Sequence, residues 1–186
     1  MPESFWQTPA GLRHVTPPGC QQPEGFDVYQ ELRELSGDHS VLEFGCGTGR
    51  LSPAFLPNRY LGVDVSPGAI NEAQHGCPEH PYLLYRGGPL PRFDMVLAWT
   101  VLLHVHDDEI ARTVQRLVKA TRTQIVIGEI MGRSWRRLGD PPVFNREPLE
   151  YVALLEAAGM RGGIRQYAKP CVRYPNSHYT IIVGQK

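Results

Sequence analysis

Hydrophobic residues recur along the chain with two different periods, which predicts alternating strands and helices. Ile110, Val114, Leu117 and Val118 fall at i, i+4, i+7 and i+8, the spacing of one helix face. Short apolar runs that end in glycine, proline or acidic residues have the length of buried strands. The pattern predicts strands at about 40–44, 60–64, 82–85, 94–99, 124–129, 163–172 and 178–184, and helices at about 26–36 and 148–158, after Ser66-Pro67, and from Asp107 onward.

Proline and glycine set the bounds of two of these helices. Ser66 followed by Pro67 predicts a helix start, because serine caps a first turn and proline fits the first helical position. Gly76 is the matching stop. Pro53 and Pro57 allow only a short helix after the preceding glycine cluster, because proline has no amide hydrogen to donate.

The alternation predicts a three-layer α/β/α sandwich around a mostly parallel sheet. A chain of 186 residues, 41% of them hydrophobic, can fill one core and is too short for two ordinary domains. We expect a single domain over 26–186, preceded by an irregular or partly helical segment, 1–25, that is a candidate lid. Ligands of such folds bind at the carboxyl ends of the strands, where Glu43, Asp64, Trp99 and Glu129 are expected.

A glycine cluster between the first two strands is the most informative motif. The apolar run Val41–Phe44 ends in Gly45-Cys46-Gly47-Thr48-Gly49, and the next apolar run ends in Asp64. Glycine permits positive φ and leaves no Cβ between the backbone and a ligand, so amide groups can approach ligand atoms directly. A carboxylate at the tip of the second strand can accept two hydrogen bonds from a ribose diol. Together they predict a site for a nucleoside-bearing ligand.

The spacing of the glycines separates the candidate nucleotides. The dinucleotide fingerprint G-x-G-x-x-G requires a small residue at position 50, where this chain has Arg50, so NAD is the second choice. A phosphate-binding loop requires Gly-Lys-Ser/Thr, which occurs nowhere in the chain.

The cluster resembles the first motif of class I S-adenosylmethionine-dependent methyltransferases, an acid followed by G-x-G-x-G, with Glu43 as the acid. Asp64 stands where that family carries its ribose-binding acid. The segments 93–105, 124–130, 151–160 and 178–184 are similar to its fourth strand, fifth strand, late helix and final strand. The resemblance covers roughly 28–186. It implies a Rossmann-like fold with a seven-stranded sheet whose last strand is antiparallel, and S-adenosylmethionine as the cofactor.

The resemblance also implies which residues contact the methyl donor. Glu43 either holds the amino-acid end of the donor through the turn or orders the backbone amides of the turn. Cys46 stands at a helix start, where thiols are acidified, but no basic partner is evident and packing is the favoured role. Many family members have an acid after the third strand; Arg86 and two glycines stand there, so the adenine contact is unassigned. The predicted donor-binding residues are Glu43, Gly45, Cys46, Gly47, Gly49, Asp64, Val65 and Trp99.

Two residues are candidate catalytic bases, His104 and Glu129. The family often has a histidine just after the fourth strand, where His104 stands; it either deprotonates an acceptor hydroxyl or is an ordinary hydrogen-bonded histidine. His104 and His106 form an H-x-H, which on an extended segment points both rings one way, but no third ligand stands at a readable spacing and no metal is predicted. The acidic run 107–109 is predicted to cap a helix.

The acceptor pocket is expected to come from the N-terminal segment and the loop 131–147, because little chain is left for a separate cap. Tyr29 and Trp99 are pocket walls or core residues, since aromatic faces attract a positive sulfur. The loop arginines either recognise a carboxylate or phosphate or lie on a solvated surface. The predicted acceptor-binding residues are Trp6, His14, Tyr29, Arg133 and Arg137, and the loop also holds Arg136 and Arg146.

Charge and cysteine content limit the kinds of partner and the cellular compartment that we expect for the protein. Nineteen basic and 19 acidic residues give a net charge of zero, without the positive field that nucleic acid selects, so no nucleic-acid partner is expected. The four cysteines form no C-x-x-C pair, which argues against a zinc cluster or a disulfide framework and suits a reducing cytoplasm. No secretion signal and no apolar run of the ~18–20 residues that span a bilayer are evident, so no membrane contact is expected.

These inferences combine into one hypothesis. The chain is predicted to transfer the methyl group of S-adenosylmethionine to an oxygen or nitrogen of a small metabolite, in bacterial specialised metabolism, as a cytoplasmic monomer or homodimer. The alternatives are an NAD-binding oxidoreductase and a catalytically inactive subunit that binds an adenosyl ligand. The identity of the acceptor does not follow from the family, because one fold hosts many reactions.

Overall fold

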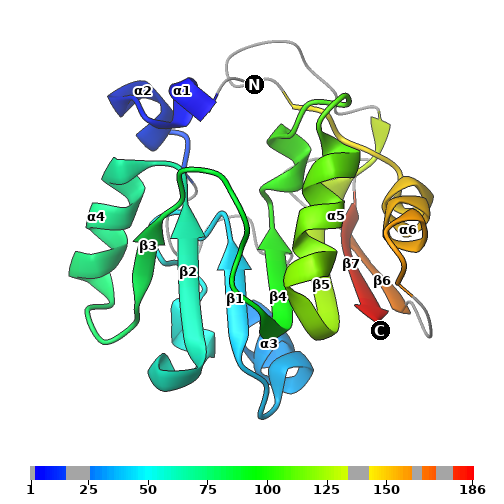
Figure 1. Ribbon diagram of the computed structural model, residues 1–186, viewed down its shortest axis with the longest axis horizontal. Helices are drawn as coiled ribbons and strands as arrows, with labels where there is room; N and C mark the ends of the chain where they lie inside the picture. Colours follow the sequence, from blue (N-terminus) through cyan, green and yellow to red (C-terminus); the bar gives the residue numbers. More distant parts are fainter. Residues whose placement is uncertain (1–2, 16–25, 134–142, 161–164, 171–177) are drawn as a thin grey trace.

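Seven strands form a single sheet in the order β3-β2-β1-β4-β5-β7-β6 (Figure 1). The computed structural model describes residues 3–15, 26–133, 143–160, 165–170 and 178–186. The first five strands are parallel, and β7 runs antiparallel to both of its neighbours. The predicted fold class is therefore confirmed. The strands are β1 (Val41–Phe44), β2 (Tyr60–Asp64), β3 (Tyr82–Leu84), β4 (Phe93–Trp99), β5 (Thr121–Met131), β6 (Arg165–Pro170) and β7 (His178–Gln185).

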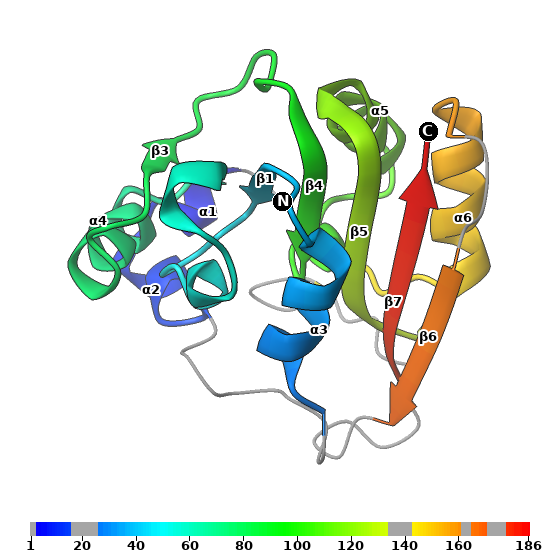
Figure 2. The same ribbon diagram turned by 90° about the horizontal axis from the view of Figure 1, so that it is seen from below.

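Helices cover both faces of the sheet, as Figure 2 shows from below. Alternate residues of β5 divide between two cores: Ile125 and Ile127 pack with α5 and α6, whereas Val126 packs with α3. The hydrophobic spacing predicted for α5 is confirmed, because Val114 and Leu117 are fully buried. The helices are α1 (Glu3–Trp6), α2 (Pro9–Leu12), α3 (Val28–Ser36), α4 (Pro67–Gly76), α5 (Ile110–Ala120) and α6 (Pro148–Ala157).

Local sequence accounts for where α4 begins. Ser66 Oγ accepts a hydrogen bond from the amide of Ala69, and Pro67 occupies the first helical position, as predicted. The prolines after the glycine cluster give two single 3-10 turns, Ser52–Ala54 and Pro57–Arg59, in place of one short helix. Between β3 and β4 the chain runs without a helix.

The N-terminal segment lies above the carboxyl ends of the parallel strands (Figure 1). Its helices α1 and α2 contact each other, and α2 contacts α4. Residues 171–177, between β6 and β7, lie outside the described part of the chain. In the described part of the chain, no helix combines the length and the apolar character needed to cross a membrane.

Candidate functional site

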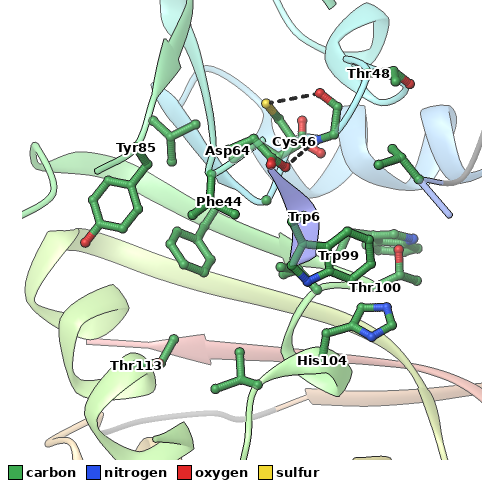
Figure 3. A pocket seen from close by; sticks show the side chains of 18 of the residues that line it. Trp6, Phe44, Cys46, Thr48, Asp64, Tyr85, Trp99, Thr100, His104 and Thr113 are labelled. Atoms are coloured by element: carbon green, nitrogen blue, oxygen red, sulfur yellow. Dashed lines mark hydrogen bonds between the residues drawn. The ribbon is translucent and has the colours of Figure 1, made fainter. Parts of the chain in front are cut away.

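A pocket of about 190 Å³ opens at the carboxyl ends of β1, β2 and β4 (Figure 3). Besides these strand ends, its lining comes from the N-terminal segment, the glycine turn 45–49, Tyr85 after β3, the segment 100–107 after β4, and α5. We call residues 100–107 the β4 turn. It contains the short 3-10 helix Leu102–His104.

The structure brings most of the predicted donor-binding residues to this pocket. Glu43, Gly45, Cys46, Gly47, Asp64, Val65 and Trp99 line it. Gly49 does not line it, because it is buried behind the turn, where an added Cβ would come within 2.6 Å of the Tyr82 hydroxyl.

The glycine turn has the backbone that its sequence predicts. Gly45, Gly47 and Gly49 have φ values of 74°, 55° and 76°, in the left-handed region that glycine adopts without strain. A Cβ on Gly45 would lie 2.4 Å from Val101 Cγ2, so the turn can pack directly on the β4 turn only with glycine there. Thr48 Oγ1 is buried in the turn without a hydrogen-bond partner among the described residues, and Thr48 lines the pocket. A polar ligand group would satisfy it.

Asp64 joins the glycine turn to the start of α4. Its Oδ2 accepts a hydrogen bond from the Gly47 amide and its Oδ1 accepts one from the Ser66 amide, both at 2.8 Å. Burial raises the pKa of this carboxyl, while the two amides oppose the rise. Because a carboxylate oxygen can accept more than one hydrogen bond, both oxygens retain capacity for a ligand hydroxyl.

Glu43 is buried and held by a tyrosine. The Tyr60 hydroxyl donates a hydrogen bond to Glu43 Oε2 at 2.5 Å. Burial raises the pKa of Glu43 to about 7, against the opposing effects of Tyr60 and Arg50. Arg50, which also lines the pocket, is itself 7% exposed. The side chain at the end of β1 is therefore close to half protonated at neutral pH.

The buried Glu43 makes stability depend on pH. Its pKa is about 7 in the folded protein against 4.5 ordinarily, so between these values the folded state binds more protons than the unfolded state. The free energy of unfolding should therefore fall as pH rises from about 4.5 to about 7. Denaturant unfolding at pH 5 and pH 8 measures this fall in the free energy of unfolding. In Glu43→Gln, whose side chain can still accept a hydrogen bond from Tyr60, the fall should be smaller by roughly 3 kcal/mol. Equal pH dependence in both proteins would contradict the buried, raised pKa.

The N-terminal segment forms one side of the pocket. The rings of Trp6 and His104 meet edge to face with centroids 4.8 Å apart, and Trp6, His14 and His104 all line the pocket (Figure 3). Val15 lies over Gly47, where an added Cβ would be 2.8 Å from Val15 Cγ1. This arrangement is consistent with the predicted lid, which stays a prediction.

Three more of the predicted site residues that the structure describes, Tyr29, Arg133 and Glu129, lie away from the pocket. The Tyr29 hydroxyl donates to the backbone oxygen of Arg50, and its ring packs against the core below α3. Arg133 is exposed and bonded to Glu150. Arg137 lies outside the described residues. Glu129 is fully buried and accepts hydrogen bonds from backbone amides, so its position does not support a role as a base.

The two histidines of the H-x-H face different surroundings. His104 faces the pocket, whereas the ring of His106 packs against Phe144 at 4.8 Å and hydrogen-bonds Asp108. His104 ends the 3-10 helix Leu102–His104 and His106 lies beyond it, so the two histidines do not share one extended segment. Asp107, expected to cap α5, forms an ion pair with Arg146 instead. In the part of the chain that the structure describes, no three metal-ligating side chains cluster.

Sequence reasoning missed a polar strip on α5. Glu109, which precedes the helix, Thr113 and Arg116 line the far end of the pocket, opposite Phe44 and Tyr85. Their spacing of i, i+4 and i+7 is the signal that could have revealed a shared face. Thr100 was also missed, although it lines the pocket with φ of 51°, a conformation that β-branched residues rarely adopt.

Comparison with known proteins shows what this part of the chain resembles. A family described as "Methyltransferase domain" matches residues 42–124, the span from β1 into β5. This span is therefore similar to methyltransferase domains. The resemblance to class I methyltransferases is thereby confirmed, and the glycine turn, Asp64 and the β4 turn all fall inside the matched span.

Proteins similar to this chain match it at low sequence identity. The ribosomal protein L11 methyltransferase of Chromobacterium violaceum is 28% identical over 131 residues, which are 61% of this chain and only 42% of that protein. Magnesium protoporphyrin IX methyltransferase of Synechocystis, solved with bound S-adenosylmethionine, superposes with a TM-score of 0.67 at 18% identity, covering 86% of this chain and 76% of that one. A Burkholderia thailandensis 1,6-didemethyltoxoflavin-N1-methyltransferase, solved with 1,6-didemethyltoxoflavin and S-adenosylhomocysteine, gives 0.66 at 20% identity over 85% and 77%.

Proposed function

We propose that the protein is an enzyme that binds S-adenosylmethionine and transfers its methyl group to an oxygen or nitrogen of a small molecule. The observation that carries this proposal is the convergence of Glu43, the glycine turn and Asp64 on one pocket, with Thr48 Oγ1 buried there without a protein partner. The family match over 42–124 supports the same activity.

Each part of the donor has residues suited to it. The amino-acid end fits the glycine turn, where Thr48 offers a hydroxyl. The ribose fits Asp64, whose oxygens can accept two further hydrogen bonds. When bound, the donor supplies a methyl group on a positively charged sulfur. The chain then has to align the acceptor with that methyl and exclude water, and alignment alone can lower the barrier by as much as ~7–11 kcal/mol.

The acceptor side of the pocket favours a small, flat molecule. Trp6, Trp99 and His104 present aromatic rings there, and flat rings stack favourably on such faces. His104 is the group placed to accept a proton from an acceptor hydroxyl, whereas a neutral amine needs no base for attack. A compound of bacterial specialised metabolism is the acceptor that we propose, with a cytoplasmic monomer or homodimer as the working form.

We further propose that the polar strip of α5 recognises the adenine edge. Once the amino-acid end lies at Thr48 and the ribose at Asp64, the base extends toward Tyr85 and Thr113 (Figure 3). The side chains of Thr113 and Arg116 make no hydrogen bond or ion pair within the described ranges, so they are available to a ligand. The Thr113 hydroxyl can accept a hydrogen bond from the adenine amine, the role that an acid after β3 would otherwise have, and Arg116 can donate one to a ring nitrogen.

Thr113→Val and Arg116→Met should each weaken binding of S-adenosylhomocysteine about 10-fold, because each removes one hydrogen bond to the base. Thr113→Val should also discriminate less between that compound and its inosine analogue, which has an oxygen in place of the 6-amino group. Isothermal titration calorimetry measures both constants. Arg112→Met, on an exposed part of the same helix, is the matched control. Unchanged affinities in both pocket variants would rule out this role.

Thermal shift with two ligands tests the proposed function directly. The protein should gain melting temperature with S-adenosylhomocysteine and none with NADH; the reverse result would favour an NAD-dependent oxidoreductase. Transfer of isotopically labelled methyl to a panel of phenols, amines and heteroaromatic compounds then separates an enzyme from an inactive binding subunit. A protein that binds the product yet labels no acceptor would be that subunit.

A further inference from the structure

The β4 turn carries pocket residues, Thr100 and His104 among them, on a backbone held by other parts of the chain. The amide of Thr100 donates to the backbone oxygen of Gly128 on β5 at 2.8 Å. Thr100 has a φ of 51°, and such a conformation persists only where the surrounding structure determines it strongly.

Glu129 bonds the amide side of this turn. Its Oε1 accepts hydrogen bonds from the amides of Val101 at 3.0 Å and Leu102 at 2.7 Å. These amides begin the 3-10 helix, so they lack partners within it. Glu129 has no exposed surface and does not line the pocket.

Arg146 bonds the carbonyl side of the same turn. Its Nη1 donates to the backbone oxygen of Leu102 at 3.0 Å, and its Nη2 donates to that of Val105 at 2.8 Å. Nη2 also reaches Asp107 Oδ1 at 2.7 Å. Arg146 is 3% exposed, which contradicts both roles expected from the sequence, a ligand contact and a solvated surface position. The planar guanidinium can bridge several acceptors in fixed directions, which a lysine ammonium cannot.

We infer that Glu129 and Arg146 are positioning residues that hold the β4 turn from its two sides and so fix His104 against the acceptor. Glu129 accepts from the two amides that begin the turn, and Arg146 donates to two of its carbonyls, of which that of Leu102 also accepts from the Val105 amide. Glu129 acts through the backbone and transfers no proton. That His104 acts on the acceptor rests on the proposed function, whereas the geometry of the turn is independent of it.

The Glu129→Gln variant distinguishes a positioning role of Glu129 from a role as a catalytic base. Burial raises the pKa of Glu129 to about 8, and one oxygen, Oε1, accepts both hydrogen bonds. Glutamine has the same length and a carbonyl oxygen but cannot take up a proton. Glu129→Gln should therefore keep the turn intact, and Glu129→Leu should release it.

The experiment follows His104 by nuclear magnetic resonance in the full chain with isotopically labelled histidine, with His104→Gln to assign the signal. Glu129→Gln should leave the ring signals of His104 and their contact with Trp6 unchanged. Glu129→Leu and Arg146→Lys should shift or broaden these signals and remove the contact. Gln124→Met is the matched control, because it removes a buried polar side chain from the opposite end of β5. It should lower the melting temperature and leave His104 unchanged.

Hydrogen exchange of the wild-type protein tests the same inference without any substitution. The amides of Val101 and Leu102 should exchange as slowly as those of β5, since their acceptor is fully buried. Fast exchange at both amides, or unaltered His104 signals in a folded Glu129→Leu or Arg146→Lys protein, overturns the inference.

Once an acceptor is known, Glu129→Gln should retain at least half of the wild-type kcat, and a 100-fold loss of kcat would identify Glu129 as a base. Failure of the wild-type protein to bind S-adenosylhomocysteine would instead refute the proposed function and leave the turn geometry standing.

Discussion

Asp64→Ala should weaken binding of S-adenosylhomocysteine by at least 100-fold, to below detection in a calorimetric titration. The carboxylate provides the acceptors for a ribose diol, and each hydrogen bond to a charged group contributes about 1.5–3 kcal/mol. The substitution also frees the Gly47 amide, which now donates to Asp64 Oδ2. Loss of that bond loosens the glycine turn, so two effects act in the same direction.

Asp94→Ala provides the control for this experiment. Asp94 accepts hydrogen bonds from the amide and hydroxyl of Ser40, and it does not line the pocket. Both variants thus lose two internal hydrogen bonds, but only one of them alters the ligand site. If the two bound S-adenosylhomocysteine equally well, Asp64 would not be the ribose contact, and the orientation proposed for the donor would have to be reversed or abandoned.

His104→Gln should lower kcat for a hydroxyl acceptor by roughly 10²–10⁴-fold, the usual contribution of a general base. Affinity for S-adenosylhomocysteine should change little, because the glycine turn and Asp64 carry that binding. For an amine acceptor the loss should be less than about tenfold, since attack by a neutral amine requires no base. Single-turnover transfer from labelled donor, measured with one phenol and one amine, gives the comparison.

His106→Gln is the matched substitution, two residues further on. His106 packs on Phe144 and hydrogen-bonds Asp108 outside the pocket, so its loss should leave kcat near the wild-type value. A wild-type rate for His104→Gln with the phenol would assign His104 to packing against Trp6 alone. Alignment and solvent exclusion would then account for the rate by themselves.

Local sequence patterns were sufficient to predict the order of the elements and the backbone of the glycine turn. The hydrophobic periods predicted the order of strands and helices, and Ser66-Pro67 fixed the start of α4, because these signals depend on neighbouring residues only. The glycine cluster predicted a turn with positive φ for a steric reason that holds in any surroundings: without a Cβ, Gly45 and Gly47 can adopt it and lie against Val101 and Val15. The family could be inferred for the same reason, since its motif consists of local steric requirements.

Long-range packing decided the rest. From the sequence, Glu129 was expected to act in catalysis and Arg146 to bind a ligand or lie in solvent. Both are buried around one turn. No residue adjacent to either in the sequence indicates that turn as its partner. Tyr29 is likewise directed away from the pocket by its bond to Arg50. Sequence by itself fixed the ligand class, the fold and the backbone of the glycine turn. The tertiary structure alone decided which charged groups face the pocket, because a buried charge goes where another segment offers it hydrogen bonds.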